Sequence, residues 1–311
     1  MKLATVQYQG KTQAGVVKDG DFYAFTDLSG DLPNDMLTLI QTYDECKPVI
    51  EAEMETAKVT CALADAKVIA PLPNPVNIRD FVGFEGHCRN AANHFGGAAA
   101  GIDLEKTVQV WKMAPGFYFS NVSPTCIVGN DQPVKMHPRS KMFDFEFEIG
   151  FIIGKTGRDI KKEDAGDYIF GFTIFNDWSA RDIQLQEVPL GVGAPLGKGY
   201  INGFGPVIVT KDEFDQYLDK NDPYRYDVKC TCTFNGEVLA ENNLNTIYYT
   251  FADMIAWASQ DMDLVPGDIL GSGTIAGCSL CEQPPASPWL KAGDVIEMEA
   301  EGIGTLMNVV E

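Results

Sequence analysis

The chain is poor in the features that mark nucleic-acid-binding and membrane-binding proteins. Its 24 lysines and arginines stand against 44 aspartates and glutamates, which gives a formal net charge of −20. Such a surface repels phosphate backbones and anionic lipids, so we expect neither nucleic acid nor a membrane as a partner. An anionic substrate would be repelled as well, unless a local cation reverses the field. The charge therefore gives a first indication of a metal ion or a basic pocket.

Long apolar runs are also missing, and we expect no N-terminal leader. No apolar run reaches the length of a membrane span, and the start, MKLATVQYQGKTQAGVV, has no basic stretch followed by an apolar one. We therefore predict a cytoplasmic protein whose eight cysteines are reduced. Cys278 and Cys281 form a lone C-x-x-C, without the second pair or paired histidines of a zinc site. We interpret the cysteines as structural.

The chain does have enough apolar residues for a large core and a boundary that divides it. Of its 311 residues, 45% are hydrophobic. Residues 2–25 have the pattern of a small β-meander, and residues 33–62 look helical. The proline-rich stretch VIAPLPNPVN, residues 68–77, then makes a stiff connection. We predict a small N-terminal β/α domain over residues 1–70 and a catalytic domain over residues 71–311.

The larger domain consists mainly of predicted strands. Residues 226–243 contain the turn Asn235-Gly236 between two strand-like runs, a strong hairpin signal. Residues 250–260 form the clearest helix, with Thr250 as its expected N-cap. Other strand patterns lie at residues 143–153, 168–177 and 205–210. These patterns indicate a β-rich α+β fold rather than a parallel βαβ array.

The most informative strand carries acidic residues on every second position. In Phe143-Asp144-Phe145-Glu146-Phe147-Glu148-Ile149, the aromatic side chains take one face and the carboxylates take the other. Three like charges in a row are mutually unfavourable where water is excluded. Either this face is a solvated acidic surface, or a cation lies against it.

A second acidic segment favours the cation. Asp177 ends an apolar strand in the context Asn-Asp-Trp-Ser-Ala-Arg-Asp, and a switch to polar residues at a strand end often marks a site. Together with Glu146 and Glu148, it supplies carboxylate oxygens that suit a hard ion such as Mg²⁺, Mn²⁺ or Ca²⁺. The sequence therefore predicts a metal site formed by these three residues.

Several motifs in order resemble the fumarylacetoacetate hydrolase family. The likeness covers about residues 70–311 and fits the N-terminal part only loosely. It is carried by DFEFEIGFIIGK at 144–155, YIFGFTIFNDWSARDIQ at 168–184, and by Arg79-Asp80-Phe81 with His87, Leu196-Gly197-Lys198, Pro266-Gly267-Asp268 and Ser272-Gly273-Thr274. The resemblance implies a mixed β-sandwich roll, a small oxo-acid substrate, a homodimer and a role in the catabolism of aromatic compounds.

The resemblance also implies roles for individual residues. Asp80 would join the metal ligands, and His87 would be the base that activates water, oriented by Glu282. Lys198 would be the cation beside the departing carbanion. The loop that holds Glu282 varies in length within the family, so Cys281 could take its place. Four residues would face the substrate: Tyr118, Arg181, Gln184 and Thr274.

Each role has a plainer alternative. His87 is one of three histidines and could be structural, Lys198 could be an ordinary loop lysine, and Thr274 could reflect strand preference alone. Asp80 could instead cap a helix that starts near residue 84.

Departures from the family pattern bear on the substrate. Asn202 stands where close relatives of the hydrolase carry threonine, and the Gly/Ala-rich segment after His87 lacks the arginine expected near residue 96. Asn90 stands where the acylpyruvate hydrolase and oxaloacetate decarboxylase branch carries the glutamate of a His-x-x-Glu dyad. The first two departures count against a fumarylacetoacetate pocket, and the third disfavours the acylpyruvate hydrolase and oxaloacetate decarboxylase branch.

Our prediction is a hydrolase that uses Mg²⁺, or Mn²⁺ or Ca²⁺, to cleave a C–C bond in a fumarylacetoacetate- or acylpyruvate-like substrate. The alternative enzyme is an isomerase, hydratase or decarboxylase of 2-oxo acids, because the same metal enolate serves all of these reactions. A non-catalytic metal-binding β-roll is the alternative outside enzymes.

Overall fold

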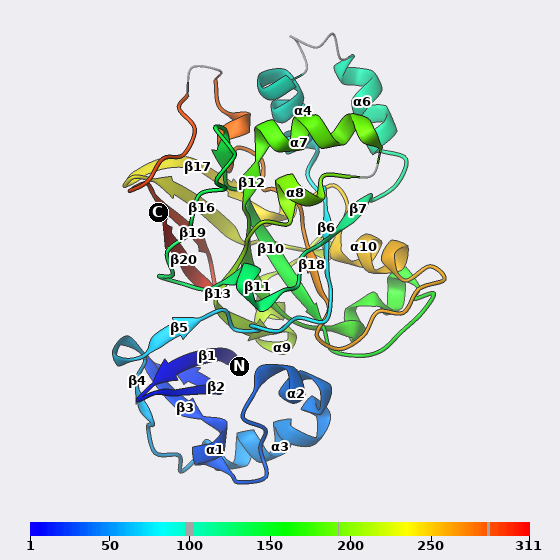
Figure 1. Ribbon diagram of the computed structural model, residues 1–311. Helices are drawn as coiled ribbons and strands as arrows, with labels where there is room; N and C mark the ends of the chain where they lie inside the picture. The colour runs from blue at the N-terminus through cyan, green and yellow to red at the C-terminus, as the bar shows by residue number, and fades with distance from the viewer. Residues whose placement is uncertain (97–102, 192, 285–286) are drawn as a thin grey trace.

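A computed structural model describes residues 1–96, 103–191, 193–284 and 287–311. Its N-terminal part (blue to cyan in Figure 1) contains five strands, β1 to β5, and three helices, α1 to α3. The strands are β1 Lys2–Tyr8, β2 Lys11–Lys18, β3 Asp21–Ala24, β4 Cys61–Ala62 and β5 Lys67–Ile69. The helices are α1 Phe25–Leu28, α2 Met36–Gln41 and α3 Tyr43–Glu53, with the short η1 Leu63–Asp65 after them.

The predicted meander is confirmed, but the predicted helix over residues 33–62 is too long. Residues 54–60 leave the helix, and Cys61 pairs with Phe22 of β3. Val59 and Thr60 are β-branched and lower the helix propensity just before this pairing. Tertiary strand pairing therefore overrides the helical pattern at its C-terminal end.

The predicted division between residues 70 and 71 is crossed by strand pairing. β1 pairs with β13 (Asn202–Thr210) through Lys2 and Val209, so the N-terminal strands extend the main sheet. The sheet order is β4-β3-β2-β1-β13-β11-β10-β18-β6-β7, with β5 beside β1 and β8 beside β13. Apolar residues of α2 and α3 share a core cluster with Ile152 and Phe175 of the main sheet.

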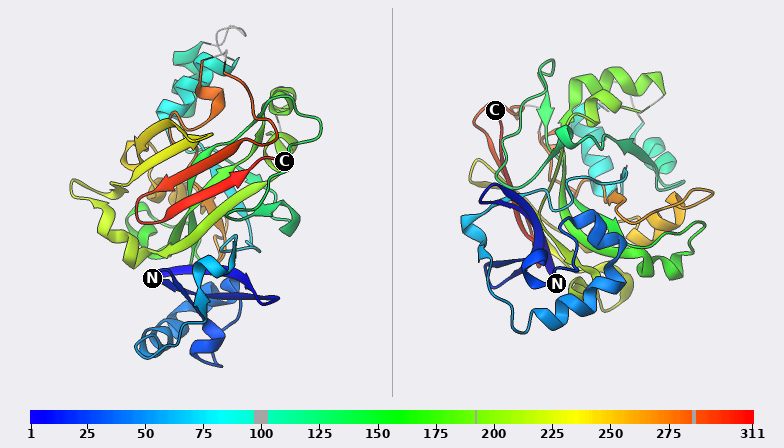
Figure 2. Two further views of the ribbon diagram at one scale, coloured as in Figure 1. Left: turned by 90° about the vertical axis from the view of Figure 1, so that its left-hand side faces the viewer. Right: turned by 60° about the horizontal axis from the view of Figure 1, so that its bottom comes forward.

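The catalytic part packs this large sheet against a second, four-stranded sheet, which is the expected β-rich α+β sandwich (Figure 2). The remaining strands of the large sheet are β6 Ile78–Phe81, β7 Phe117–Ser120, β8 Ile127–Val128, β10 Phe147–Ile153, β11 Ile169–Asp177 and β18 Ile269–Gly271. The second sheet has β17 Glu237–Asn243, β16 Lys229–Phe234, β19 Val295–Ala300 and β20 Gly304–Val309 in that order. Two small pairs are β9 Phe143–Asp144 with β12 Ser179–Ala180, and β14 Leu218–Asp219 with β15 Asp222–Tyr226.

Helices gather at one end of the sandwich and along its side (Figure 1). They are α4 Glu85–Ala91, α6 Leu104–Trp111, α7 Arg181–Glu187, α8 Pro195–Lys198, α9 Lys211–Phe214 and α10 Phe251–Ala258. Short helical turns are η2 Ala92–Gly96, η3 Pro124–Cys126, η4 Lys162–Tyr168, η5 Val188–Leu190, η6 Asp215–Tyr217, η7 Leu244–Thr246 and η8 Leu280–Glu282. Among the described residues, none of the helices is long and apolar enough to span a bilayer.

Two local predictions are confirmed in detail. The hairpin turn has positive φ at Asn235 (52°) and Gly236 (81°), as a type I′ turn requires. Thr250 caps α10 in a capping box with Asp253. The gap in the described chain at residues 97–102 contains part of the Gly/Ala-rich segment that follows His87, so that segment lies partly outside the described residues.

The acidic strand is interrupted where strict alternation predicts continuity. β9 ends at Asp144 and β10 begins at Phe147. The backbone N–H of Phe145 donates to Asp144 Oδ1 (2.8 Å), and that of Glu146 donates to Asn176 Oδ1 (3.2 Å). Side-chain oxygens therefore accept the two backbone N–H groups, while the Glu146 carbonyl still accepts the Asp177 N–H (3.1 Å). The apolar/polar pattern alone does not reveal this break.

One buried ion pair anchors strand β6. Arg79 Nη1 donates to Asp268 Oδ2 (2.6 Å), and the two residues are 2% and 0% exposed. Asp268 also accepts from Asn77 Nδ2 (2.8 Å) and from the backbone N–H of Val265 (3.2 Å). The pair fixes β6 beside β18, and the next residue of β6 is Asp80.

Replacing Asp268 with alanine should lower the free energy of unfolding by about 3–5 kcal/mol, because Arg79 would stay buried without its counter-ion. Urea unfolding followed by tryptophan fluorescence measures the change. The matched control is Asp263→Ala, which breaks a pair with Arg158 whose side chains are 53% and 54% exposed. The control should lose less than about 1 kcal/mol. Equal losses in the two variants would contradict this account of the buried pair.

Candidate metal and acid–base site

The acidic side of the predicted metal strand is buried. Asp144, Glu146 and Glu148 are at most 4% exposed, and the aromatic residues between them are fully buried. A solvated acidic surface is therefore excluded for this strand. Buried carboxylates need cations or hydrogen-bond donors, and the surroundings supply both.

Three carboxylates from three strands converge in one place. Asp80 of β6, Glu148 of β10 and Asp177 at the end of β11 offer oxygen atoms within 4.8 Å of one another. Sheet pairing brings them together, since β18 lies between β6 and β10, and β11 pairs with β10. This triad can hold a metal ion. It contains three of the four predicted metal residues, including Asp80, which does not cap a helix.

The triad has the properties of a cradle for a hard divalent cation. Among the described residues, Asp80 Oδ1 and Asp177 Oδ1 are buried oxygens without a hydrogen-bond partner. A methyl group added at Gly271 would come within 2.3 Å of Asp80 Oδ1 and 2.8 Å of Glu148 Oε2, so the missing side chain leaves the carboxylates room. An all-oxygen donor set suits Mg²⁺, Mn²⁺ or Ca²⁺.

Glu146, the fourth predicted ligand, is occupied by cations of the protein. Its Oε1 accepts from Arg181 Nη2 (2.6 Å), and its Oε2 accepts from Lys198 Nζ (2.5 Å). Lys198 Nζ also donates to Asp177 Oδ2 (2.5 Å) and Ser179 Oγ (2.9 Å). Lys198 therefore links Glu146 to the triad, and all three of its N–H groups have protein acceptors.

Burial and neighbouring charges separate the pKa values of these acids. Burial raises the pKa of Asp80, Glu148 and Asp177, and the neighbouring carboxylates add to the rise in pKa at Glu148 and Asp177. Burial also acts to raise the pKa of Glu146, but Arg181 and Lys198 hold it well below its usual range. Glu146 is thus neutralised by protein cations, whereas the triad is the part of the cluster that a bound cation would stabilise.

His87 and Glu282 form a hydrogen-bonded pair beside the carboxylates. His87 lies on α4 and its Nδ1 is 2.9 Å from Glu282 Oε1, while its Nε2 is 3.8 Å from Glu146 Oε1. Burial acts to lower the pKa of His87, but Glu282 and Glu146 outweigh it, and the pKa is raised. Glu282 accepts further bonds from Asn90 Nδ2 (3.0 Å), the Gly277 N–H (2.8 Å) and Ser279 Oγ (3.1 Å). The pair turns Nε2 towards the carboxylates.

A cavity of about 290 Å³ opens onto this cluster. The predicted substrate residues Tyr118, Arg181, Gln184 and Thr274 line it, together with His87, Lys198, Asp80 and Glu146. The Tyr118 hydroxyl is 2.7 Å from both Asp80 Oδ2 and Asp177 Oδ2, so it also touches the triad. Arg181 Nη1 donates to Gln184 Oε1 (3.1 Å), which fixes two lining residues relative to each other. The structure thus brings all the predicted site residues into one region.

Asp144, which the family likeness leaves outside the metal shell, organises the surroundings of the site. Its Oδ2 accepts from Arg181 Nε (2.7 Å) and from the Cys281 N–H (3.1 Å), and its Oδ1 accepts from the Leu280 N–H (2.8 Å). It therefore fixes Arg181 and the turn η8 that carries Glu282. Its place on the acidic face was visible in the sequence, but its partners were not.

Two residues that depart from the family pattern have structural partners. Asn90, three residues after His87, donates to Glu282, so the carboxylate of the pair comes from η8 instead of from α4. Asn202 is fully buried, accepts from Ser120 Oγ (3.0 Å) and donates to the Asn121 carbonyl (2.9 Å). Asn202 therefore holds the end of β7, the strand that carries Tyr118.

The comparisons with known proteins agree with this architecture. The sequence model of the fumarylacetoacetate (FAA) hydrolase C-terminal domain matches residues 78–311. The chain belongs to the fumarylacetoacetate hydrolase family. It is similar to the mitochondrial oxaloacetate tautomerase of Xenopus laevis, with 30% identity over 90% of this chain and 79% of the relative. A second mitochondrial oxaloacetate tautomerase, from Rattus norvegicus, is 38% identical over 62% of this chain and 58% of its own length.

Solved structures of the family share the whole fold. A fumarylacetoacetate hydrolase from Exiguobacterium antarcticum is 28% identical, with a TM-score of 0.78 over 100% of this chain and 99% of its own. A maleylpyruvate hydrolase from Sphingobium sp. SYK-6, solved with manganese(II) and pyruvate, has a TM-score of 0.72 at 24% identity, covering 100% and 98%. The family contains tautomerases as well as hydrolases, so membership establishes an enzyme family but leaves the reaction open.

Filling the space at Gly271 should weaken metal binding. In Gly271→Ala the new methyl group would push Asp80 and Glu148 apart, and we expect the dissociation constant for Mn²⁺ to rise at least about tenfold. The matched control is Gly150→Ala, because Gly150 pairs with Gly271 and an added methyl group there meets no atom closer than 3.4 Å. Electron paramagnetic resonance of free Mn²⁺ gives both constants. Wild-type affinity in Gly271→Ala would contradict the triad as the metal site.

Glu146 and Glu148 should differ in their effect on metal affinity. Glu148→Gln removes a triad charge and should weaken Mn²⁺ binding more than about tenfold, which is 1.4 kcal/mol. Glu146→Gln should weaken it less, since both oxygens of Glu146 already accept bonds from Arg181 and Lys198. The same titration compares them. A larger loss in Glu146→Gln would show that Glu146 leaves its cations and binds the metal directly.

Proposed function

We propose that the protein is a divalent-metal-dependent tautomerase that interconverts the keto and enol forms of a small 2-oxo dicarboxylic acid such as oxaloacetate. The observation that carries the proposal is the His87–Glu282 pair, whose Nε2 lies 3.8 Å from Glu146 Oε1, in the same cluster as the triad that can hold the cation. Tautomerisation needs one group that takes a proton from carbon and returns it to oxygen. The oxaloacetate tautomerases among the relatives support this choice of substrate.

The residues of the site have separable tasks in this reaction. Asp80, Glu148 and Asp177 would hold the cation. When bound, the cation would polarise the 2-oxo group and lower the pKa of the C–H group on the adjacent carbon. His87 Nε2 takes a proton from carbon 3, and the C–H electron pair moves into the new carbon–carbon double bond. The same proton, or one exchanged with water, then passes to the oxygen at carbon 2. Glu282 holds the ring and stabilises its charge while the proton is carried.

The hydrogen bonding of Lys198 supports tautomerisation over C–C hydrolysis. Hydrolysis has to stabilise a departing carbanion, and Lys198 is the predicted cation beside it. Its three N–H groups are directed at Glu146, Asp177 and Ser179. In this arrangement Lys198 balances charge and has no N–H aimed into the cavity, which favours a reaction that needs only His87.

C–C hydrolysis is the second candidate, because the His87–Glu282 pair has the geometry that would activate a water molecule. The 28%-identical structural relative that is named a fumarylacetoacetate hydrolase supports this alternative. Two assays distinguish the candidates. With oxaloacetate, a tautomerase speeds the decay of the enol absorbance while total oxaloacetate, measured by coupled NADH oxidation, stays constant. With acetylpyruvate, a hydrolase releases acetate and pyruvate, and this outcome without tautomerisation would replace the first proposal by the second.

His87→Gln should reduce the enzyme-catalysed tautomerisation rate about 10²- to 10⁴-fold, the usual contribution of a positioned base. Enol absorbance with oxaloacetate and Mg²⁺ measures the rate, and Mn²⁺ affinity should stay within about threefold of wild type because His87 is outside the triad. The matched control is the exposed His94 in the same segment, and His94→Gln should keep the wild-type rate. An unchanged rate in His87→Gln would refute the role of this histidine as the base.

A further inference from the structure

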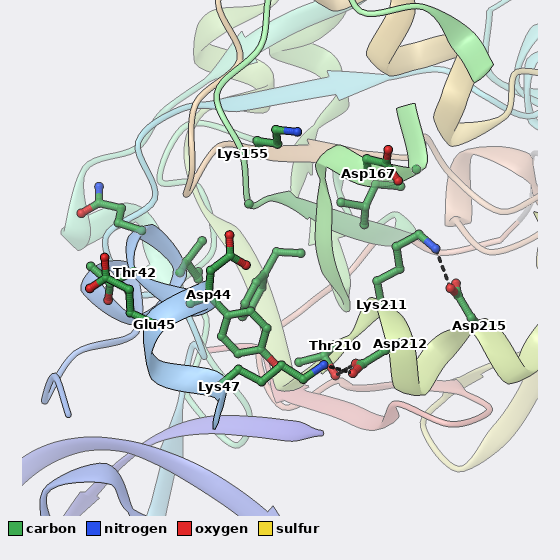
Figure 3. Close-up of a pocket in the computed structure, with 17 residues that line it drawn as sticks. Thr42, Asp44, Glu45, Lys47, Lys155, Asp167, Thr210, Lys211, Asp212 and Asp215 are labelled. Carbon is green, nitrogen blue, oxygen red and sulfur yellow. Dashed lines mark hydrogen bonds and ion pairs between the residues drawn. The ribbon is translucent and has the colours of Figure 1, made fainter. Parts of the chain in front are cut away.

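Several cavities larger than the catalytic one lie elsewhere in the described part of the molecule, and two of them differ clearly in the charge of their lining. The first, of about 560 Å³, lies between α3 and the ends of β10, β11 and β13 (Figure 3). The second, of about 570 Å³, lies against α8 and the residues that follow it. Neither contains a residue of the carboxylate triad.

The cavity in Figure 3 is a poor site for an anion. Two of its three lysines, Lys47 and Lys211, are paired with Asp212 (2.6 Å) and Asp215 (2.5 Å), as the dashed lines show, and the third is Lys155. Further carboxylates from Asp44, Glu45 and Asp167 line it. This cavity has more acidic than basic groups, so its lining is negatively charged, as the whole chain is.

The lining of the cavity beside α8 does not share this excess of acidic groups. None of the described residues that line it is an aspartate or glutamate, although the chain has a net charge of −20. Lys135 stands exposed at its edge and forms no ion pair within the described part of the chain. Val128, Leu196 and Ile201 give the cavity an apolar wall. The described lining thus combines a cation with an apolar surface and contains no carboxylate.

His137 supplies a hydrogen-bond donor among the residues that line this cavity. It is 7% exposed, and its ring packs on Tyr200 with centroids 4.7 Å apart. Its Nδ1 accepts the backbone N–H of Arg139 (3.3 Å), so the neutral ring carries its proton on Nε2. Nε2 has no hydrogen-bond partner among the described residues, and His137 lines the cavity. Burial and Arg139 lower the pKa of His137, which keeps the ring neutral near pH 7.

We propose that this cavity is a second ligand site, which binds a small organic carboxylate. The carboxylate accepts the His137 Nε2–H and pairs with Lys135, and the apolar body of the ligand packs on Tyr200 and Leu196. Pro195 and Leu196 of α8 line the cavity, and the same short helix carries Lys198 into the catalytic site. A ligand in this cavity therefore contacts the segment that positions a catalytic-site cation.

Binding of benzoate to the metal-free full-length chain tests the proposal. Ligand-observed NMR titration of EDTA-treated protein should show saturable binding of one benzoate, with little binding of benzyl alcohol, which has the ring but no charge. His137→Phe keeps a ring on Tyr200 but removes the N–H, and it should raise the dissociation constant at least about tenfold. Lys135→Met changes an exposed residue and should raise it about two- to fivefold, so it tests the site even where His137→Phe does not fold.

The matched control is Lys155→Met, which removes one lysine from the cavity in Figure 3 and changes the net charge by the same amount. It should leave benzoate affinity unchanged. The proposal fails if benzoate binding does not saturate, if His137→Phe and Lys135→Met bind it as wild type does, or if Lys155→Met weakens it as much as Lys135→Met. A loss of tautomerase activity in other assays would not bear on this result, since binding is measured without metal or substrate.

Discussion

The structure around the site depends on how five buried carboxylates are compensated. Asp80, Asp144, Glu146, Glu148 and Asp177 are each at most 4% exposed, and two cations, Arg181 and Lys198, make contact with this group. If all five are ionised, three negative charges remain, which is a cost that a folded protein tolerates only with a proton or a cation. The protein cations lie beside Asp144, Glu146 and Asp177, whereas Asp80 and Glu148 have no ion pair within the described chain. A divalent cation at the triad would reduce these three charges to one.

The same compensation orders the elements that surround the site. Asp144 holds Arg181 at the start of α7 and the backbone of η8, and η8 carries the Glu282 that orients His87. Lys198, at the end of α8, reaches Asp177 of β11 and Glu146 in the break between β9 and β10. Helices that are distant in sequence are therefore tied to the sheets through buried charge, and the position of His87, the proposed base, depends on the same network as the triad that can hold a cation.

From the sequence we could predict the strands and the residues of the site, but not which of these residues contact each other. The fold class, the hairpin at Asn235-Gly236 and the N-cap Thr250 follow from local patterns, and the structure confirms them. The break in the strand at residues 145–146 could not be predicted, because it depends on Asn176 from another strand. The set of site residues followed from family likeness, but the separation of Glu146 from the triad depends on which carboxylates Arg181 and Lys198 reach. Such contacts join residues that are far apart in the sequence, so no regular spacing of residues reveals them.

Family membership constrains the metal chemistry more tightly than the reaction, because the reactions of the family differ in their proton transfers. A cation on carboxylates can stabilise the enolate of many oxo acids, so hydrolysis, decarboxylation and tautomerisation share that part of the site. They differ in how many protons the protein must move and to which atom. Here the proposed base, His87, is held by Glu282, which in turn accepts hydrogen bonds from Asn90, Gly277 and Ser279. The N–H groups of Lys198 all bond to protein acceptors. Such a site fits the proposed reaction, which returns one proton to the same substrate, whereas cleavage would also need a cation free to stand beside the leaving carbanion.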